Sequence, residues 1–234
     1  MVTVSAHARK NSYAAMVKMF SKKIWVLIVL FIAPLIFYIF LLTGTNNFAK
    51  LPVVTENIGN VSHFKTQDST VISLDGKISI LCFLGNDLQA VKNNALNLNE
   101  KIYKHFYKFR DFQFIVVLPE GTQQQAVELN KELGAITDMQ KWNFVFGSSE
   151  DISDFFDTLE TTYLLNSNSY SPYAFIIDKD THLRGRLNDE DAENGVSYGY
   201  NAETVAPIHS KMVDDVKVLI AEYRLALKKN KREI

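Results

Sequence analysis

Cys82 is the only cysteine in the 234-residue chain, and its chemistry can be judged from its surroundings. A single thiol cannot form a disulfide within its own chain, so an intramolecular dithiol reaction is excluded. Cys82 lies inside the apolar run Lys77–Leu84 and not in the turn Gly85–Asp87, where a sulfur would be exposed. A cysteine among aliphatic and aromatic residues is usually a small buried hydrophobe with a raised pKa. We therefore expect an inert thiol, with an exposed sulfur that pairs with a partner protein as the alternative.

The five histidines lack the short spacings that let a helix or a hairpin hold a metal ion. A metal site assembled from the distant His63, His105 and His182 is the alternative to solvated or capping histidines. The acidic segment 188–200 is only faintly similar to a calcium loop, because Tyr200 stands where a bidentate glutamate is needed. We interpret it as a flexible acidic loop, and we expect no metal and no cofactor.

Sequence motifs for several common enzyme sites are absent. The chain has no P-loop, no G-x-G-x-x-G and no G-x-S-x-G motif, so phosphate cradling, dinucleotide binding and a hydrolase elbow have no support. The formal net charge is −1, and residues 1–23 contain basic residues but no acid, which leaves the remainder mildly acidic. Such a balance would not hold a phosphate polyanion strongly, so nucleic-acid binding is not expected.

An uncharged apolar run at residues 24–42 predicts a transmembrane helix. At about 1.5 Å per residue the run spans roughly 28 Å of hydrocarbon, and the basic segment 1–23 before it indicates a cytoplasmic N-terminus. A cleaved signal peptide is the alternative, although the run exceeds a usual signal core and no Ala-x-Ala-like site follows. We expect a single-pass protein of the cytoplasmic (inner) membrane, with a linker at 43–60 and a periplasmic or otherwise extracytoplasmic domain at 61–230.

The elements that would position any site alternate between strand and helix. Apolar runs bounded by turn residues predict strands, and apolar residues at helical spacing predict helices. The expected order is a short strand 71–74 in a hairpin with strand 78–84, helix 89–109, strand 112–118, helix 122–133, strand 142–146, helix 151–164, strand 173–178, returning strand 183–187 and helix 202–229. This alternation is typical of an α/β fold.

The order of elements, with Pro172 leading into the penultimate strand, resembles the thioredoxin fold and more closely the membrane-anchored Sco/SenC family. The likeness is carried by the single anchor, the terminal amphipathic helix and a series of segments: Leu74–Ile78, Ile102–Phe106, Lys141–Gly147, Glu150–Ile152, Phe175–Lys179 and Leu183–Arg186. The resemblance implies a central mixed sheet flanked by helices. It also implies a setting in which family members act as copper chaperones or thiol reductants for the CuA centre of cytochrome oxidase.

The copper ligands of that family are missing from this sequence. The family has a Cys-x-x-x-Cys motif after the central strand and a histidine before the penultimate strand. Counted without gaps from Lys77, the cysteine positions fall on Leu88 and Lys92, and the histidine position falls near Tyr170. Thiolates and imidazole hold Cu(I), whereas a leucine has no lone pair and an ammonium repels the ion. We therefore carry over no catalytic or metal-binding residue.

A surface for recognising a partner is the remaining candidate site. A cis-proline at Pro172 would shape a concavity beside the turn after the central strand, and an ordinary trans proline is equally consistent with the sequence. We predict a partner-binding surface, with Trp142 as a further contributor, formed by Gly85, Asn86, Asp87, Leu88, Tyr170, Pro172 and Tyr173.

Together these observations favour a non-catalytic, membrane-anchored, thioredoxin-like accessory protein and not an enzyme. By resemblance its setting is respiratory cytochrome oxidase assembly, with an oxidase subunit or an active Sco-like protein as the partner. The first alternative is an atypical copper-binding or thiol-redox Sco-like protein that acts through Cys82. The second alternative is a structural tether in an envelope complex.

Overall fold

The computed structural model describes three stretches of the chain, residues 24–40, 50–192 and 194–230. The chain divides into two units, Met1–Phe48 and Ala49–Ile234, and we describe each by itself.

In the first unit, residues 24–40 form a helix whose side chains are all exposed. Leu41 and Leu42 of the predicted anchor lie outside the described residues, as does the basic segment 1–23. No helix within the described stretches is both long enough and apolar enough to cross a membrane.

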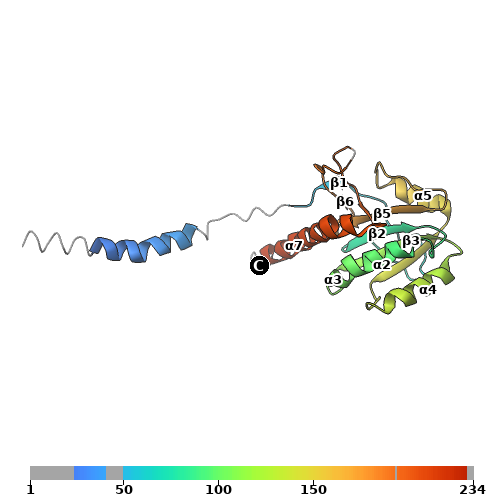
Figure 1. Ribbon diagram of the computed structural model, residues 1–234, viewed down its shortest axis with the longest axis horizontal. Helices are drawn as coiled ribbons and strands as arrows, with labels where there is room; N and C mark the ends of the chain where they lie inside the picture. The colour runs from blue at the N-terminus through green and yellow to red at the C-terminus, as the bar shows by residue number, and fades with distance from the viewer. Residues whose placement is uncertain (1–23, 41–49, 193, 231–234) are drawn as a thin grey trace, which may run out of the picture. The chain divides into compact units, whose positions relative to one another are not determined.

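A seven-stranded mixed sheet forms the centre of the second unit (Figure 1). Its strands are β1 (Val53–Thr55), β2 (Ile78–Leu84), β3 (Phe112–Pro119), β4 (Trp142–Gly147), β5 (Tyr170–Ile177), β6 (Leu183–Arg184) and β7 (Tyr200–Asn201). The order across the sheet is β1-β6-β5-β2-β3-β4, and β7 pairs with β5 outside this path. The strands β2, β3 and β4 are parallel, whereas β5 is antiparallel to β2. The predicted α/β class with a mixed sheet is confirmed.

Helices cover both faces of this sheet (Figure 1). They are α2 (Lys92–Leu98), which continues through the π-helical turn η1 (Asn99–Tyr103) into α3 (Lys104–Phe106), α4 (Gln123–Gly134), α5 (Ser149–Asp157), α6 (Val205–Pro207), the π-helical turn η2 (Ile208–Met212) and α7 (Val213–Asn230). Residues of α2, α4 and α7 pack on one face, and residues of α5 pack on the other.

Side chains along β2 alternate between two hydrophobic clusters. Ile80 and Cys82 belong to the cluster that includes α2, α4 and α7, whereas Leu81 and Phe83 belong to the cluster that includes α5 and the segment 58–64. Successive side chains of a strand point to opposite faces of the sheet. Because both faces are covered, almost every position of β2 is apolar, which explains the continuous run seen in the sequence.

The predicted linker 43–60 differs from the structure in its second half. Val53–Thr55 forms β1, an edge strand that pairs antiparallel with β6. The Gly185 N–H donates to the Pro52 carbonyl at 3.0 Å, and the Thr55 hydroxyl donates to the Leu159 carbonyl at 2.8 Å. These partners are distant in sequence, so the local pattern of three residues did not reveal the strand.

Three other predicted elements are shorter in the structure or absent from it. Residues 71–74 form no strand, and the returning strand spans Leu183–Arg184 only. The helix predicted at 151–164 begins after Ser148, whose hydroxyl accepts the Asp151 N–H at 3.1 Å, and it ends at Asp157. A left-handed Glu160, with φ of 49°, prevents the helix from continuing.

Candidate functional site

Cys82 lies in the middle of β2, beside Val116 of β3 and Ala174 of β5. The residue is only 2% exposed, and burial raises the pKa of its thiol well above the ordinary value. The thiolate is the form that attacks disulfides and binds soft metals. At neutral pH this thiol is therefore protonated and has no access to solvent. The expectation that Cys82 is buried is confirmed.

The turn after β2 is packed against the start of β5. Gly85 adopts a left-handed φ of +71°, and a Cβ at this position would lie 2.8 Å from the Tyr170 Cβ and 2.9 Å from the Asn168 carbonyl oxygen. Only glycine accepts both the backbone angle and this contact. The turn and Tyr170, which are predicted to share one surface, are thus neighbours in the structure.

Gln125 of α4 holds the same turn from the other side. Its Oε1 accepts the Leu88 N–H at 3.0 Å, and its Nε2 donates to the Asn86 carbonyl at 3.1 Å. Asn86 and Asp87 are exposed, but Leu88 is only 1% exposed and packs in the core. The predicted surface is corrected accordingly: Gly85 and Leu88 shape the turn from within, and Asn86 and Asp87 present their side chains to solvent.

The positions that match the family's copper ligands contain no soft donor in this fold. Leu88 is buried, and the Lys92 ammonium forms an ion pair with Glu132 at 2.9 Å. Within the described stretches, no group of three His, Cys, Asp or Glu side chains could hold a metal ion. The structure also does not assemble His63, His105 and His182 into such a group.

Tyr170 connects α2 to the segment that follows β7. Its hydroxyl accepts the Asn94 side-chain N–H at 2.9 Å and donates to the Glu203 carboxylate at 2.9 Å. Burial raises the pKa of Tyr170 to about 12, and the hydrogen bond to Glu203 acts in the same direction. Tyr170 is therefore a neutral, positioned hydroxyl and not a base.

Pro172 and Tyr173 leave the β2–β5 ladder and pair with β7. The register shifts here, because Cys82 lies opposite Ala174 whereas Phe83 lies opposite Ser171. No described peptide bond is cis, so Pro172 is trans. Its carbonyl accepts the Ala202 N–H at 2.8 Å. A bulge of this kind redirects side chains, and a proline fits it because its nitrogen donates no ladder hydrogen bond.

The redirected residues line a groove of about 640 Å³, which we call the β5–β7 groove. Tyr173 stacks on Tyr163 with ring centroids 3.7 Å apart and an interplanar angle of 2°. The Tyr198 ring lies edge-on to Tyr163 at 6.1 Å. Tyr200 and Lys211 also line the groove. Stacked tyrosine rings with polar groups beside them suit a recognition surface.

Two ion-pair networks border the β5–β7 groove, and the first is centred on Lys211. Its ammonium contacts the Asp189 carboxylate and lies 2.6 Å from Asp191. Burial opposes ionisation of Asp189, but the Lys211 ammonium and the Asp191 N–H outweigh it and hold the pKa of Asp189 below its ordinary value. The sequence of this segment predicts a flexible acidic loop. In the structure, however, Asp189 is buried and paired.

The second network is centred on Asp215 of α7. Its carboxylate accepts two hydrogen bonds from Arg186, at 2.7 and 3.0 Å, and a third from the Tyr200 hydroxyl. Burial and then the charge of Asp215 raise the pKa of Tyr200 well above its ordinary value. Asp215 is only 7% exposed, although its position on a charged stretch of the terminal helix gives no sign of burial. A buried carboxylate could not be recognised without knowing its partners.

Trp142 does not join this surface. It lies in β4, which is separated from β2 by β3 and from β5 by two strands. Of the predicted surface residues, the structure brings together Asn86, Asp87, Tyr170, Pro172 and Tyr173 around the turn and the β5–β7 groove.

Comparison with known proteins places the fold. No protein-family model matches the chain, and no curated protein matches its sequence. Among solved structures, BsSco, a member of the Sco family of cytochrome c oxidase assembly proteins, is similar with a TM-score of 0.50 and 15% identity, over 72% of this chain and 95% of that one.

Two other solved structures are less similar. Copper-bound ScoI from Arabidopsis thaliana has a TM-score of 0.46 and 17% identity over 68% of this chain and 97% of its own. A thiol:disulfide interchange protein from Bacteroides sp. has a TM-score of 0.40 and 13% identity over 58% of this chain and 79% of its own. The likeness to BsSco shows that the second unit has a Sco-like thioredoxin fold.

Proposed function

We propose that this chain is a non-catalytic, membrane-anchored accessory protein whose thioredoxin-like domain binds another protein. The observation that carries the proposal is the state of Cys82. It is the only thiol in the sequence, it is 2% exposed, and burial raises its pKa. A protein with this thiol has neither the paired sulfurs for disulfide exchange nor an accessible thiolate for copper.

The proposed binding surface consists of the turn at Asn86 and Asp87, Tyr170, and the β5–β7 groove with Pro172 and Tyr173. Its support is geometric, because the trans Pro172 bulge turns the Tyr163–Tyr173 stack toward the groove. Tyrosines at such surfaces contribute large contact area at a small loss of side-chain entropy.

The proposed setting is the assembly of cytochrome oxidase. It is supported by the fold likeness to BsSco, which belongs to a family of cytochrome c oxidase assembly proteins. On this proposal the partner is an oxidase subunit or an active Sco-like protein. Fold likeness is an analogy, so the partner must be identified by experiment.

The proposed anchor is the helix that includes residues 24–40. It is supported by the absence of charge over 24–42 and by the basic segment 1–23 before it. The domain is then extracytoplasmic under the positive-inside rule. Cysteine labelling from either side of the membrane, with single cysteines introduced at Ser5 or Ser167 in a Cys82→Ala chain, measures this orientation directly.

The partner test is a pull-down of the full chain from detergent-solubilised membranes, with identification of the co-purifying proteins. We expect an oxidase subunit or assembly protein that is lost with Tyr173→Ala and kept with Tyr107→Ala. Tyr107 is a matched control, because it is also half-buried and stacked on another tyrosine, Tyr103, at 5.6 Å. Recovery of envelope proteins unrelated to respiration would remove the oxidase setting and favour a structural tether.

The chemical test is Cu(I) titration and a disulfide-reduction assay of the full chain. We expect neither stoichiometric tight copper binding nor turnover. Tight binding that disappears with Cys82→Ser would contradict the non-catalytic proposal and favour the atypical redox or copper protein.

A further inference from the structure

The strand β4 forms one edge of the sheet, and this edge is only partly covered. Lys65 pairs with Phe146 in an isolated antiparallel bridge. The Lys65 N–H donates to the Phe146 carbonyl at 3.1 Å, and the Phe146 N–H donates to the Lys65 carbonyl at 2.9 Å. Both backbone groups of Phe146 therefore point away from β3.

The backbone groups of Phe144 point in the same outward direction. Even-numbered and odd-numbered residues of a strand direct their backbone groups to opposite sides. The carbonyls of Lys141 and Gly147 accept from Phe114 and Glu120, on the β3 side, which fixes the odd residues of β4 as inward. The N–H and C=O of Phe144 are thus left on the open edge, with no hydrogen-bond partner among the described residues.

The segment that could have covered Phe144 turns away instead. After Lys65 the chain forms a closed loop in which the Thr66 hydroxyl accepts the Thr70 N–H at 2.8 Å and donates to the Thr70 carbonyl at 3.0 Å. Ser69, with φ of 56°, lies in the left-handed region and donates to the Thr66 carbonyl at 3.0 Å. A strand that began at Lys65 is therefore interrupted just before it reaches Phe144.

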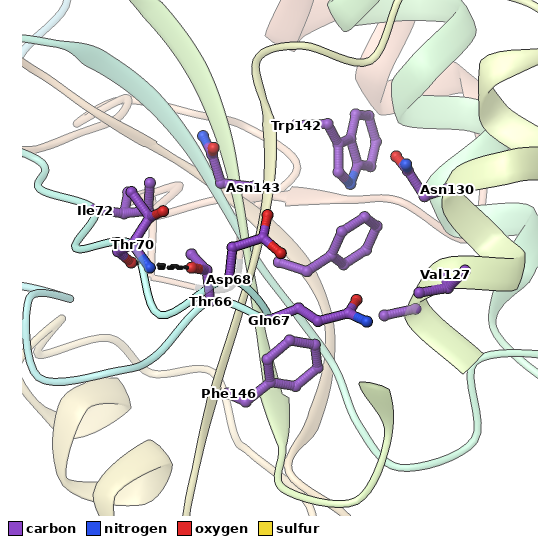
Figure 2. Close-up of a pocket in the computed structure, with 12 residues that line it drawn as sticks. Thr66, Gln67, Asp68, Thr70, Ile72, Val127, Asn130, Trp142, Asn143 and Phe146 are labelled. Atoms are coloured by element: carbon purple, nitrogen blue, oxygen red, sulfur yellow. Dashed lines mark hydrogen bonds between the residues drawn. The ribbon is translucent and has the colours of Figure 1, made fainter. Parts of the chain in front are cut away.

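The space left beside Phe144 is a pocket of about 260 Å³, which we call the β4-edge groove (Figure 2). The loop 66–72 lines one side, and Val127 and Asn130 of α4 line the other. Trp142 is 5% exposed, and its indole N–H has no hydrogen-bond partner within the described residues. Figure 2 shows this nitrogen on the side of the ring that faces the groove. A buried indole N–H normally donates to an acceptor, and the described residues supply none to Trp142. A bound ligand could therefore supply the missing acceptor.

The groove also has an uncompensated negative charge. Asp68 is the one ionisable side chain among the described residues that line it. It is exposed, and it forms no ion pair with any described residue. A basic side chain from outside the protein would complement this charge.

We propose that the β4-edge groove binds an extended peptide segment of a partner protein that carries a lysine or arginine. The peptide continues the antiparallel line that Lys65 begins, exchanges backbone hydrogen bonds with Phe144, and places a carbonyl on the Trp142 indole and its basic side chain beside Asp68. Strand addition to a sheet edge is a recurrent mode of peptide recognition. At about 260 Å³ the groove is smaller than the roughly 300–1,000 Å³ typical of small-molecule sites, which favours a narrow strand. This inference does not depend on the function proposed for the β5–β7 groove.

The experiment selects peptides from a random heptapeptide library on the full-length protein in detergent, followed by hydrogen exchange of the protein with a selected peptide. We expect selected peptides to be β-prone and to contain Lys or Arg, and we expect the Phe144 amide to become protected. Selection of peptides that protect other amides, or selection of none, would overturn the proposal.

Three variants locate the contacts. Phe144→Pro removes the outward N–H without removing a hydrogen bond to β3. We expect this variant to bind the peptide at least about tenfold more weakly than Phe144→Leu, which keeps the amide. Trp142→Phe removes the indole donor and should weaken binding about threefold to tenfold. Asp68→Asn should weaken peptides with a basic residue about twofold to fivefold and leave their neutral analogues unchanged.

Two results would contradict the proposal that the β4-edge groove binds a peptide segment of a partner protein. Equal affinity of Phe144→Pro and Phe144→Leu, with circular dichroism showing both folded, would exclude strand addition at this edge. A dimer of the full chain that dissociates in Phe144→Pro without any peptide would show that the occupant is a second copy.

Discussion

The turn after β2 and the β5–β7 groove are neighbouring regions built in opposite ways. The turn is held by backbone and core contacts, because Leu88 is buried and Gly85 is pressed against Tyr170, and only Asn86 and Asp87 of this turn present their side chains to solvent. The β5–β7 groove is open and is bordered by paired charges, with Lys211 on two aspartates. The comparison shows that the turn is shaped by backbone and core contacts, whereas the neighbouring groove is bordered by paired charged side chains.

The difference has one electrostatic cause. In the middle of the sheet nothing compensates the loss of water, so burial keeps the Cys82 thiol neutral. At the border of the β5–β7 groove, Asp189 is also buried, but the Lys211 ammonium compensates the loss of water and the carboxylate stays charged. Whether a buried titratable group is neutral or charged therefore depends on whether a charged partner lies beside it.

The largest effect should come from Asp215→Ala, which tests whether the border of the β5–β7 groove is held by its charges. The change leaves Arg186 and the buried Tyr200 hydroxyl without their acceptor, and we expect a loss of about 3–5 kcal/mol in the free energy of unfolding, measured by urea denaturation. Asp214→Ala is the matched control, because this adjacent aspartate is exposed and should have no measurable effect. Similar losses in both variants would show that the network does not hold the groove.

Gly85→Ala tests whether the turn is held by its backbone. The new Cβ would lie 2.8 Å from Tyr170 Cβ in a left-handed conformation, and we expect destabilisation of about 2–3 kcal/mol. Gly76→Ala is the control, because Gly76 has a φ of +73° but nothing within 4 Å of a Cβ, so only the strain of about 1 kcal/mol applies. Equal losses would mean that the contact with Tyr170 is unimportant.

Cys82→Ser tests whether the centre of the sheet tolerates a buried polar group without a partner. A hydroxyl buried among apolar side chains should destabilise the protein by about 1–3 kcal/mol, and Cys82→Ala by less than Cys82→Ser. In the unmodified protein, a thiol reagent should react with Cys82 only after denaturant is added. Rapid labelling of the folded protein would show that the thiol is accessible.

The smallest effect is a pH dependence from Asp189. Because its pKa in the folded protein is lower than in the unfolded chain, its contribution to stability is present above the unfolded value of about 3.9 and is lost as pH falls through the folded pKa. Lys211→Gln should flatten the fall in unfolding free energy between about pH 5 and pH 3. Lys217→Gln, which pairs with the exposed Asp214, serves as the control; identical slopes in Lys211→Gln and the unmodified protein would rule out the Lys211 effect.

Elements with strong internal patterns could be predicted from the sequence. The run at 78–84 gave β2 with the bounds the structure has, and 112–118 gave β3 within one residue. The strands β1 and β7 have two or three residues each and exist because of β6 and β5, so they have no local signature. The helix at 89–109 agrees with the structure in type, but its π-helical turn η1 could not be predicted, because a pattern of apolar residues does not show where the backbone bonds change from i→i+4 to i→i+5.

The candidate site was predicted in part. Tyr170, Pro172 and Tyr173 were identified from the position of a proline before a strand, and the structure places them beside the turn and the β5–β7 groove. Tyr163 and Lys211 were missed, because their roles come from contacts across the fold. The open edge at Phe144 was equally invisible, since a strand's pattern does not say which of its sides has a neighbour.

By itself the sequence determined that no intrachain disulfide can form, since it has one cysteine, and that an apolar strand-and-helix order must fold around a covered sheet. Only the tertiary structure decided that the Cys82 thiol is neutral and inaccessible and that Pro172 is trans in a bulge. It also decided that Asp189 and Asp215 are buried in ion pairs with Lys211 and Arg186. The physical reason is range. Periodicity is a property of neighbours along the chain, whereas desolvation and charge pairing depend on residues that meet only after folding.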